Sequence, residues 1–239
     1  MFKSKLAINI TQKMMTGNLL DLGLRDYVDV WKLQRKLVSL RANEQIPDTL
    51  ILVEHPHVFT VGKAVPGVIP VMIGGVPVIR IERGGQWTYH GPGQLVGYPI
   101  VDLNARGRDV HKFVWNIEEM LIRALNGFEI KSGRMEGRDK TGVWVGNNKI
   151  ASIGAAIRNW ITFHGFALNV NTDMNYFAMI QPCGMPSSTM TSMKMLLNDN
   201  VDFDRVKSTV LREFEHLFHL DLQRQVPEWP VQETFQTEN

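Results

Sequence analysis

Apolar residues recur at the spacing of an amphipathic α-helix in three separate stretches of the chain. The three core-facing stripes are Tyr27, Val30, Trp31, Gln34, Leu37 and Val38; Phe113, Val114, Ile117, Met120, Leu121, Ala124 and Leu125; and Val206, Val210, Phe214, Leu217 and Phe218. Asp109, a residue type that caps helices, precedes the second stripe, and Asn126-Gly127 follows it as a stop signal. The third stretch begins at Asp202. We therefore predict three helices that face a core.

Short apolar runs bounded by turn residues lie between these helices and predict strands. The predicted strands cover residues 49–53, 76–82, 95–101, 141–145, 149–158 and 161–170. Gly146-Asn147-Asn148 reads as a hairpin turn between two of them, and Arg158-Asn159-Trp160 as a second turn. The order of helix, strands, helix, strand meander and helix indicates an α/β or α+β domain.

No flexible linker, charge block or internal repeat divides the sequence, so we expect residues 1–239 to form a single domain. The tail from Gln223 to the end, which contains Pro227 and Pro230, is expected to fray or to wrap the surface.

Composition indicates a globular protein and excludes some classes of partner and location. A hydrophobic fraction of 44% and a charged fraction of 21% are those of an ordinary globular chain, and a net charge of +2 gives no reason to expect nucleic acid as a partner. The apolar stretch 65–79 is interrupted by prolines and glycines, and no secretory signal follows the first residues. We therefore expect a cytoplasmic protein that does not span a membrane.

The densest candidate site is the stretch 83–99, which is rich in glycine. Its glycines leave backbone N–H groups accessible to a ligand, and its polar side chains are Arg83, Thr88, Tyr89, His90 and Gln94. It lacks both the Walker sequence and the Gly-x-Gly-x-x-Gly spacing of a dinucleotide site. A mobile loop would not explain this set of side chains, so we favour a substrate-binding loop.

Cys183 is the chain's single cysteine, which excludes an internal disulfide and a multi-cysteine zinc site. A lone cysteine is more often a small buried apolar residue than a nucleophile. Pro182 and Gly184, however, place this thiol on a stiff turn. A nucleophilic thiol needs a nearby base or cation, and His90, His164 or Lys149 could serve.

Two further patterns have structural explanations. In the predicted strand around His164, Phe163, Gly165 and Ala167 share one face, which leaves room for a slender ligand but equally suits a core strand. His55 and His57 flank Pro56 without carboxylates or thiols at a suitable spacing, so we assign them a structural role and expect no metal.

Taken together, these motifs resemble the lipoate–protein ligase B family, the octanoyl-[acyl-carrier-protein]:protein N-octanoyltransferases. The resemblance runs from about residue 50 to 195 and covers the segments 54–56, 83–99, 142–145, 149–154, 164–169 and 182–184. Trp87 and the Asp139-Lys140-Thr141 run depart from the family pattern.

The resemblance implies a mixed, mainly antiparallel sheet with packed helices, like the catalytic domain of biotin and lipoate protein ligases. It implies that Cys183 forms an acyl thioester and that Lys149 lowers the pKa of its thiol. The implied acyl and pantetheine contacts are Arg83, Gly84, Gly85, Gln86, Trp87, Thr88, Tyr89, His90, Ser152, Ile153, Gly154, Gly165, Phe166 and Ala167.

The implied activity moves octanoyl from octanoyl-acyl carrier protein to a lysine of a lipoyl domain, without ATP or another cofactor. The acceptors would be lipoyl domains of 2-oxoacid dehydrogenase complexes and the glycine cleavage H protein, and we expect a monomer. The alternatives are an ATP-dependent lipoate or biotin ligase and a non-catalytic acyl-binding protein on the same scaffold. Cys183 and Lys149 together favour the transferase.

Overall fold

The structure of the protein is a computed structural model that describes residues 14–137, 140–182 and 186–226. Its strands are β1 (Met15–Leu24), β2 (Thr49–Glu54), β3 (Val58–Val61), β4 (Met72–Ile73), β5 (Val76–Arg80), β6 (Trp87–His90), β7 (Gln94–Ile100), β8 (Gly142–Val145), β9 (Asn148–Arg158), β10 (Ile161–Asn169) and β11 (Leu220–Arg224). Its helices are α1 (Tyr27–Ala42), α2 (Val110–Asn126), α3 (Met193–Leu197) and α4 (Phe203–Phe218), with 3-10 turns η1 (Asn104–Arg106), η2 (Met174–Met179) and η3 (Ser187–Thr189).

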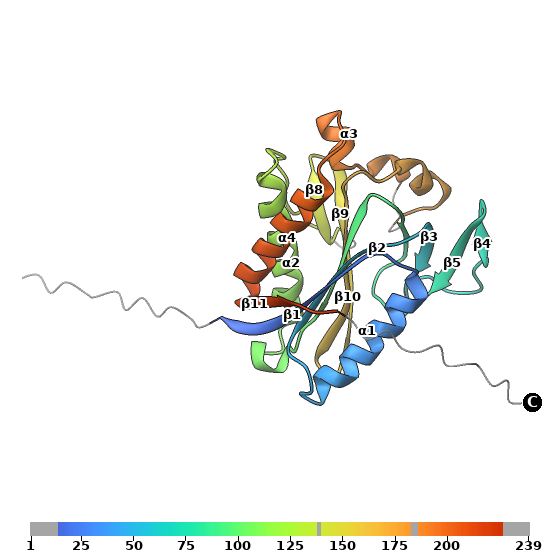
Figure 1. Cartoon of the computed structure of the whole chain (residues 1–239). Helices are drawn as coiled ribbons and strands as arrows, with labels where there is room; N and C mark the ends of the chain where they lie inside the picture. Colours follow the sequence, from blue (N-terminus) through green and yellow to red (C-terminus); the bar gives the residue numbers. More distant parts are fainter. Residues whose placement is uncertain (1–13, 138–139, 183–185, 227–239) are drawn as a thin grey trace, which may run out of the picture.

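A large sheet in the order β11-β1-β2-β7-β10-β9-β8 forms the centre of the molecule (Figure 1). β1 runs parallel to both β11 and β2, and every other neighbouring pair in this sheet is antiparallel. The hairpins β8–β9 and β9–β10 turn at Gly146-Asn147 and Asn159-Trp160, as their turn residues predict. The expected mixed, mainly antiparallel sheet is confirmed.

A smaller sheet in the order β4-β5-β3-β6 packs beside the large one. β3 is parallel to β5 and antiparallel to β6. Gly62 directly follows β3, and a Cβ atom at this position would lie 2.4 Å from the carbonyl oxygen of Gly85 and 2.9 Å from that of Arg83. A side chain at Gly62 would therefore push away the loop that follows β5, so glycine keeps that loop against the small sheet.

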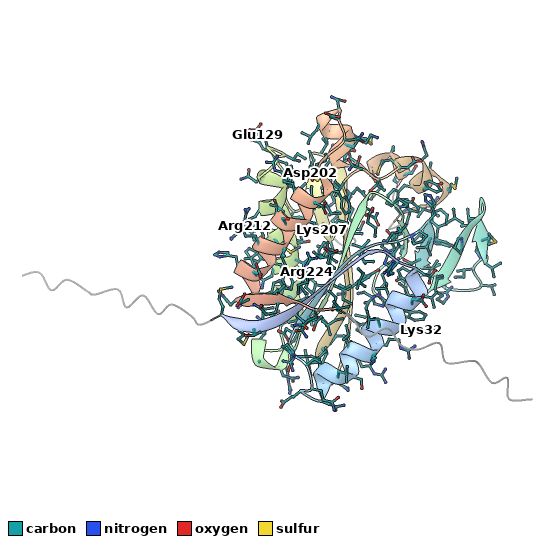
Figure 2. All side chains as sticks on the ribbon, in the orientation of Figure 1. Lys32, Glu129, Asp202, Lys207, Arg212 and Arg224 are labelled. Carbon is teal, nitrogen blue, oxygen red and sulfur yellow. The ribbon has the colours of Figure 1, made fainter. Side chains whose placement is uncertain are left out.

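Helices cover both faces of the large sheet (Figure 1). α2 and α4 pack together on one face, where Ile117 and Phe214 belong to a core with Leu168 of β10. α1 covers the other face, where Val30 packs in a second core with Ile51. Figure 2 shows side chains filling the space between helices and sheet, while the charged residues it labels lie toward the outside.

The three predicted helices are confirmed, and their caps explain where they begin. The side chain of Asp109 accepts a hydrogen bond from the backbone N–H of Lys112 (2.9 Å), and Asp202 accepts one from Arg205 (3.0 Å). Asp26 caps α1 in the same way. On α1, Leu33 is buried although the stripe omits it, and Trp31 is only half-buried.

The strands β1, β3, β4, β6 and β11 were not expected from the pattern. β6 lies inside the glycine-rich stretch, where four residues are too few for a periodic signal. Gln223 and Arg224 belong to β11 and pair with Asn18 and Leu19 of β1, so of the two expectations for the tail, fraying does not hold for these residues. Residues 227–239 lie outside the described ranges.

Within the described ranges, none of the helices combines the length and the apolar character that crossing a membrane requires.

Candidate active site

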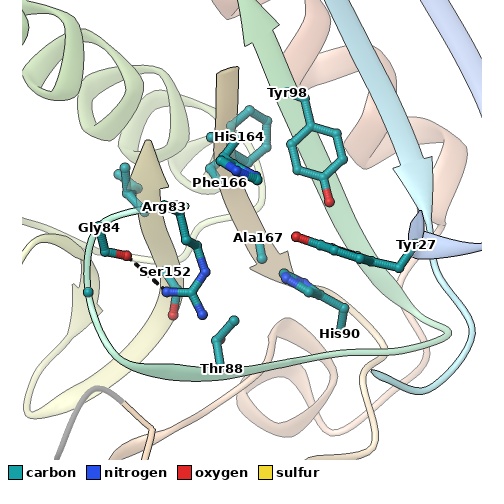
Figure 3. A pocket seen from close by; sticks show the side chains of 14 residues that line it. Tyr27, Arg83, Gly84, Thr88, His90, Tyr98, Ser152, His164, Phe166 and Ala167 are labelled. Atoms are coloured by element: carbon teal, nitrogen blue, oxygen red, sulfur yellow. Dashed lines mark hydrogen bonds between the residues drawn. The ribbon is translucent and has the colours of Figure 1, made fainter. Parts of the chain in front are cut away.

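A pocket of about 470 Å³, part of it open to solvent, lies where β6, β7, β9 and β10 meet the loop after β5 and the start of α1 (Figure 3). Its lining consists of Tyr27, Arg83, Gly84, Gly85, Thr88, His90, Tyr98, Ser152, Ile153, Gly154, His164, Gly165, Phe166 and Ala167.

The structure brings together residues that the sequence placed in three separate motifs. The stretch 83–90 contributes one wall of the pocket, Ser152 to Gly154 of β9 contribute the second, and Gly165 to Ala167 of β10 the third. The pairing of β9 with β10 places Gly154 opposite Gly165 and Ser152 opposite Ala167. Residues 152–154 of β9 and 165–167 of β10 thus form one continuous surface.

Three of the predicted contact residues lie outside this lining. Tyr89 is fully buried and its hydroxyl is 2.7 Å from Nδ1 of His57, in an aromatic cluster with Tyr176. Trp87 is half-buried and pairs with Val61 of β3. The carbonyl of Gln86 accepts a hydrogen bond from Gly62. Alternation along β6 explains why Thr88 and His90 face the pocket while Tyr89 does not.

Three lining residues were not among the predicted contacts: Tyr27, Tyr98 and His164. Tyr27 looked like a core residue of a helical stripe, and it packs as one, but its position in the first turn of α1 carries its hydroxyl to the pocket (Figure 3). Tyr98 and His164 fall inside motifs that the sequence singled out. Each of them is a polar side chain within a mainly apolar predicted strand, and this pattern could have identified both from the sequence.

Arg83 is a buried cation that ties the pocket loop to the small sheet. Its Nη2 donates to the carbonyl oxygen and to the hydroxyl of Thr60, both at 2.9 Å, and its Nη1 donates to the carbonyl of Gly84 at 2.9 Å. These oxygens replace the water that burial removes, so the guanidinium keeps its charge beside the pocket.

Hydrogen bonds fix the tautomer of His90. The amide nitrogen of Gln94 donates to the carbonyl of Tyr89 and to the side-chain oxygen of Asn169, whose own amide donates to the carbonyl of Thr191. The oxygen of Gln94 must therefore face Nδ1 of His90, 2.8 Å away, and Nδ1 carries the proton. Burial lowers the pKa of His90 to about 3, so its Nε2 is a hydrogen-bond acceptor at neutral pH.

The same reasoning assigns the hydrogen-bond roles of His55 and Tyr98. Nδ1 of His55 lies 2.8 Å from the carbonyl of Arg25 and must donate to it, which leaves Nε2 to accept the hydroxyl proton of Tyr98 at 2.8 Å. Burial lowers the pKa of His55 to about 4. His55 therefore holds the hydroxyl of Tyr98, a residue that lines the pocket.

His164 adopts a left-handed backbone conformation with φ of 54°, which is uncommon for a residue with a side chain. Its backbone N–H donates to Oε1 of Gln34 on α1 (2.8 Å), and this bond holds the unusual conformation. Burial lowers the pKa of His164, although the carboxylate of Glu82, 3.8 Å from Nε2, acts in the opposite direction. Neither His164 nor His90 is therefore a cation that could activate a thiol.

Buried neutral histidines make a prediction about acid stability. Between pH 7 and 5 the unfolded chain binds protons at His55 and His90, whereas the folded rings stay neutral, so the free energy of unfolding should fall as the pH falls. Each ring should contribute a slope of up to about 1.4 kcal/mol per pH unit below pH 6.5. Urea denaturation at several pH values, kept above the titration of carboxylates, measures this slope.

The exposed residue His111 on α2 supplies the control, because its ring is in water in the folded and unfolded states. His111→Gln should leave the slope as it is in the wild type. A free energy of unfolding that stays constant from pH 7 to 5 would contradict the neutral state of the buried rings.

Lys149 is 1% exposed at the start of β9. Its side chain lies along Gly142 of β8, where a Cβ atom would be 2.5 Å from Cε and 3.3 Å from Nζ of the lysine. Gly142 pairs with Ser152, which lines the pocket, whereas Lys149 itself is not among the lining residues. Nζ is also 5.4 Å from the centre of the Trp144 ring. A Cβ atom at Gly142 would also lie 2.4 Å from the carbonyl oxygen of Ala151, so a side chain here would collide with the backbone of β9 as well as with the lysine.

The predicted nucleophile Cys183 lies outside the described residues, but the residues that flank its segment are well placed. Pro182 bridges Trp87 at the start of β6 in parallel fashion. Met190 bridges Lys149, and the N–H of Thr191 donates to the carbonyl of Lys149 at 3.0 Å. The chain therefore lies beside β6 at Pro182 and beside Lys149 at Met190.

No group of three histidine, cysteine, aspartate or glutamate side chains suited to a metal ion occurs among the residues that the structure describes.

Comparison with known proteins adds independent findings. The family of the lipoyl protein ligase A/B catalytic domain matches residues 26–215. An octanoyltransferase of Caldicellulosiruptor saccharolyticus is 42% identical over 85% of this chain and 89% of its own length, and one of Syntrophotalea carbinolica is 44% identical over 82% and 92%.

Solved structures with similar folds include a lipoate-protein ligase A bound with ATP, with a TM-score of 0.68 and 17% identity over 89% of this chain and 90% of that one. A biotin protein ligase from Aquifex aeolicus in complex with biotin and ATP has a TM-score of 0.52 and 12% identity over 84% and 70%. At these identities the likeness concerns the fold, which confirms the expected architecture.

Proposed function

Because this chain belongs to the lipoyl protein ligase A/B catalytic-domain family and is an octanoyltransferase like the relatives it matches, we propose that it acts through a thioester on Cys183. The donor in this proposal is octanoyl-acyl carrier protein. The acceptor is the lysine of a lipoyl domain in a 2-oxoacid dehydrogenase complex or in the glycine cleavage H protein.

The observation that carries the proposal is the double anchoring of the segment that contains Cys183. Pro182, the residue before the cysteine, is paired with Trp87, and Thr88 next to Trp87 lines the pocket. Met190, after it, is paired with Lys149. Chain connectivity holds the Cα atoms of neighbouring residues 3.8 Å apart. These anchors support a cysteine that works at the pocket with Lys149 as its partner.

The first half-reaction uses the thiolate of Cys183 and the ammonium of Lys149. A cation beside a thiol lowers its pKa from about 8.5 toward neutrality, which supplies the nucleophile. The sulfur attacks the carbonyl carbon of the octanoyl thioester, a new C–S bond forms and the bond to the carrier sulfur breaks. The departing carrier thiolate takes a proton from Lys149. The octanoyl group is now bound to Cys183 and Lys149 is neutral.

The second half-reaction restores the starting state. The neutral amine of the acceptor lysine attacks the carbonyl carbon, a C–N bond forms and the C–S bond to Cys183 breaks. Lys149 takes the proton that the attacking nitrogen loses, which regenerates the ammonium and thiolate pair. Thioester exchange is nearly isoenergetic and conversion of a thioester to an amide is downhill. The reaction therefore needs no ATP, which separates this proposal from an ATP-dependent ligase.

The test is to mix the protein with octanoyl-acyl carrier protein and to record its intact mass. We expect the mass of one octanoyl group on the wild type, labile to hydroxylamine as a thioester is, and its transfer to an added lipoyl domain. A wild type that transfers octanoyl without ever carrying a labile adduct would contradict the covalent route, and one that requires ATP would favour the ligase alternative.

The apolar part of the pocket makes a prediction about acyl length. Ser152 faces the pocket, so Ser152→Leu should fill space that the octanoyl chain needs and slow acylation by an octanoyl thioester about 10-fold or more relative to a butanoyl thioester. Ser152→Ala, which keeps the space open, is the control. Equal slowing with both donors would show that the acyl chain does not run past Ser152.

A further inference from the structure

Glu118 is a charged residue on the core-facing side of α2. The other buried residues of this helix are apolar, Ile117 and Leu121 among them, and Glu118 is only 9% exposed. A buried carboxylate is costly unless hydrogen bonds replace the water that it loses. The partners that this carboxylate finds inside the protein therefore explain why it can lie there.

Both carboxylate oxygens of Glu118 have a partner. Oε1 accepts from the backbone N–H of Gly142, and Oε2 accepts from Nε of Arg134, each at 3.0 Å. Arg134 is itself held in place, because its Nη2 donates to the carbonyl of Trp115 at 3.0 Å and to Glu119 at 2.9 Å. The carboxylate is thus fixed by α2 and by Arg134, and it is bonded to the first residue of β8.

Gly142 is the residue that borders the side chain of Lys149. Its φ of 138° is one that residues with a side chain rarely adopt. A Cβ atom here would lie 2.5 Å from Cε of Lys149, so the bare backbone of Gly142 forms one side of the space in which the lysine lies. The ring of Trp144, whose centre is 5.4 Å from Nζ, forms another side. A shift of Gly142 would therefore change where the amine can lie.

The segment that contains Arg134 also holds Trp144. The N–H of Gly133 donates to the carbonyl of Trp144 at 2.8 Å, and the N–H of Trp144 donates back to the carbonyl of Gly133 at 2.9 Å. Arg134 directly follows Gly133 in the chain. The ion pair of Arg134 with Glu118 therefore joins α2 to both residues that border the lysine.

We propose that Glu118 is a positioning residue for Lys149: by accepting the N–H of Gly142, it keeps the start of β8 against the lysine and so fixes the place of the amine. The proposal rests on the role of Lys149 in the octanoyl transfer proposed above and extends that role to α2. Neither Glu118 nor Arg134 lines the pocket. Glu118 affects the reaction through Lys149.

The experiment measures single-turnover transfer of octanoyl to a lipoyl domain and the rate at which iodoacetamide alkylates Cys183 at neutral pH. Glu118→Leu removes the acceptor and should slow transfer roughly 10- to 100-fold, because a small displacement of a reacting group has effects of this size. Alkylation should also be slower, since a displaced ammonium favours the thiolate less. Removal of an anion that acted only through its charge would instead favour the thiolate and speed alkylation. Faster or unchanged alkylation would overturn the proposal.

Two conservative variants separate the hydrogen bond from the charge. Glu118→Gln keeps an oxygen that can accept from Gly142, since Arg134 retains its bonds to Trp115 and Glu119, and transfer should stay within about 3-fold of the wild type. Glu118→Asp keeps the charge but draws its oxygens back from Gly142, so it should slow both reactions. The opposite order, with the aspartate variant fast and the glutamine variant slow, would overturn the proposal. This comparison serves also if Glu118→Leu does not fold.

A double-mutant comparison shows whether Glu118 acts through the lysine. In a Lys149→Met background, Glu118→Leu should lower transfer by less than about 2-fold, because the amine that it positions is absent. An equal loss in both backgrounds would reveal a general effect on the fold and would overturn the proposal. Wild-type transfer by Glu118→Leu beside slow transfer by Lys149→Met would overturn it alone. Wild-type transfer by Lys149→Met would remove the proposed role of Lys149 as well.

Glu119 supplies the matched control on the same helix. Its carboxylate bonds Arg134 and Arg123, each at 2.9 Å, whereas the N–H of Gly142 bonds Glu118. Glu119→Leu removes a carboxylate from the same arginine and should leave transfer and alkylation near the wild-type rates. A Glu119→Leu variant as slow as Glu118→Leu would show that any loss of charge from α2 has this effect, which contradicts a specific role of Glu118.

Discussion

Cys183→Ser should carry no labile octanoyl adduct and should lose transfer to lysine on the order of 10³-fold or more. The serine hydroxyl stays protonated near neutral pH, and a lysine ammonium that suffices to hold a thiolate cannot generate an alkoxide. The two measurements are the intact mass after incubation with octanoyl-acyl carrier protein and the single-turnover rate of lipoyl-domain acylation.

The sequence makes this experiment unusually clean. Cys183 is the single cysteine of the chain, so any thioester on the wild type must be on that residue. The melting temperature of Cys183→Ser serves as the control for folding, and we expect it within a few degrees of the wild type, since the change replaces one small side chain by another. An octanoyl adduct of equal stability on the variant would exclude Cys183 as the acyl carrier.

Lys149→Met should reduce transfer roughly 10²- to 10⁴-fold, the range that proton transfer by a placed side chain contributes. Methionine keeps most of the apolar stem that lies along Gly142 and against Trp144, so packing changes little while the amine is lost. The thiol of Cys183 should also react more slowly with iodoacetamide at neutral pH, because the ammonium proposed to favour the thiolate is lost.

The chain contains a matched control for this variant. Lys140 places its Nζ 5.1 Å from the centre of the same Trp144 ring, but it is half-buried and is not paired with Met190 as Lys149 is. Lys140→Met removes a cation from the same aromatic neighbour and should leave the alkylation rate near that of the wild type. If the two variants slow alkylation equally, the effect is a general loss of positive charge and not a specific partnership with Cys183.

Elements with local signals could be predicted from the sequence. The helices α2 and α4 begin at the aspartates that their sequences offer as caps, and β9 and β10 are joined at the turn that Arg158-Asn159-Trp160 indicates. Apolar periodicity, caps and turns act within a few residues, so each can be recognised without knowledge of the rest of the chain.

Elements that depend on distant partners could not be predicted from the sequence. β11 is a strand because β1, about 200 positions earlier, offers it a parallel edge, and β6 exists because β3 pairs with it. The donor and acceptor roles of the polar groups in the pocket could not be predicted for the same reason. Whether His90 accepts or donates is decided by Gln94, Asn169 and the carbonyl of Thr191, and the sequence spacing of these residues carries no such information.

The described anchors of the proposed reacting pair belong to different sheets. Pro182 is attached to β6 of the small sheet through Trp87, whereas Lys149 belongs to β9 of the large sheet. The distance between Pro182 and Lys149 therefore depends on how the two sheets sit against each other. The loop of residues 83–85 folds onto the end of β3 at Gly62. A side chain at Gly62 would displace that loop and so change the position of Pro182 relative to Lys149.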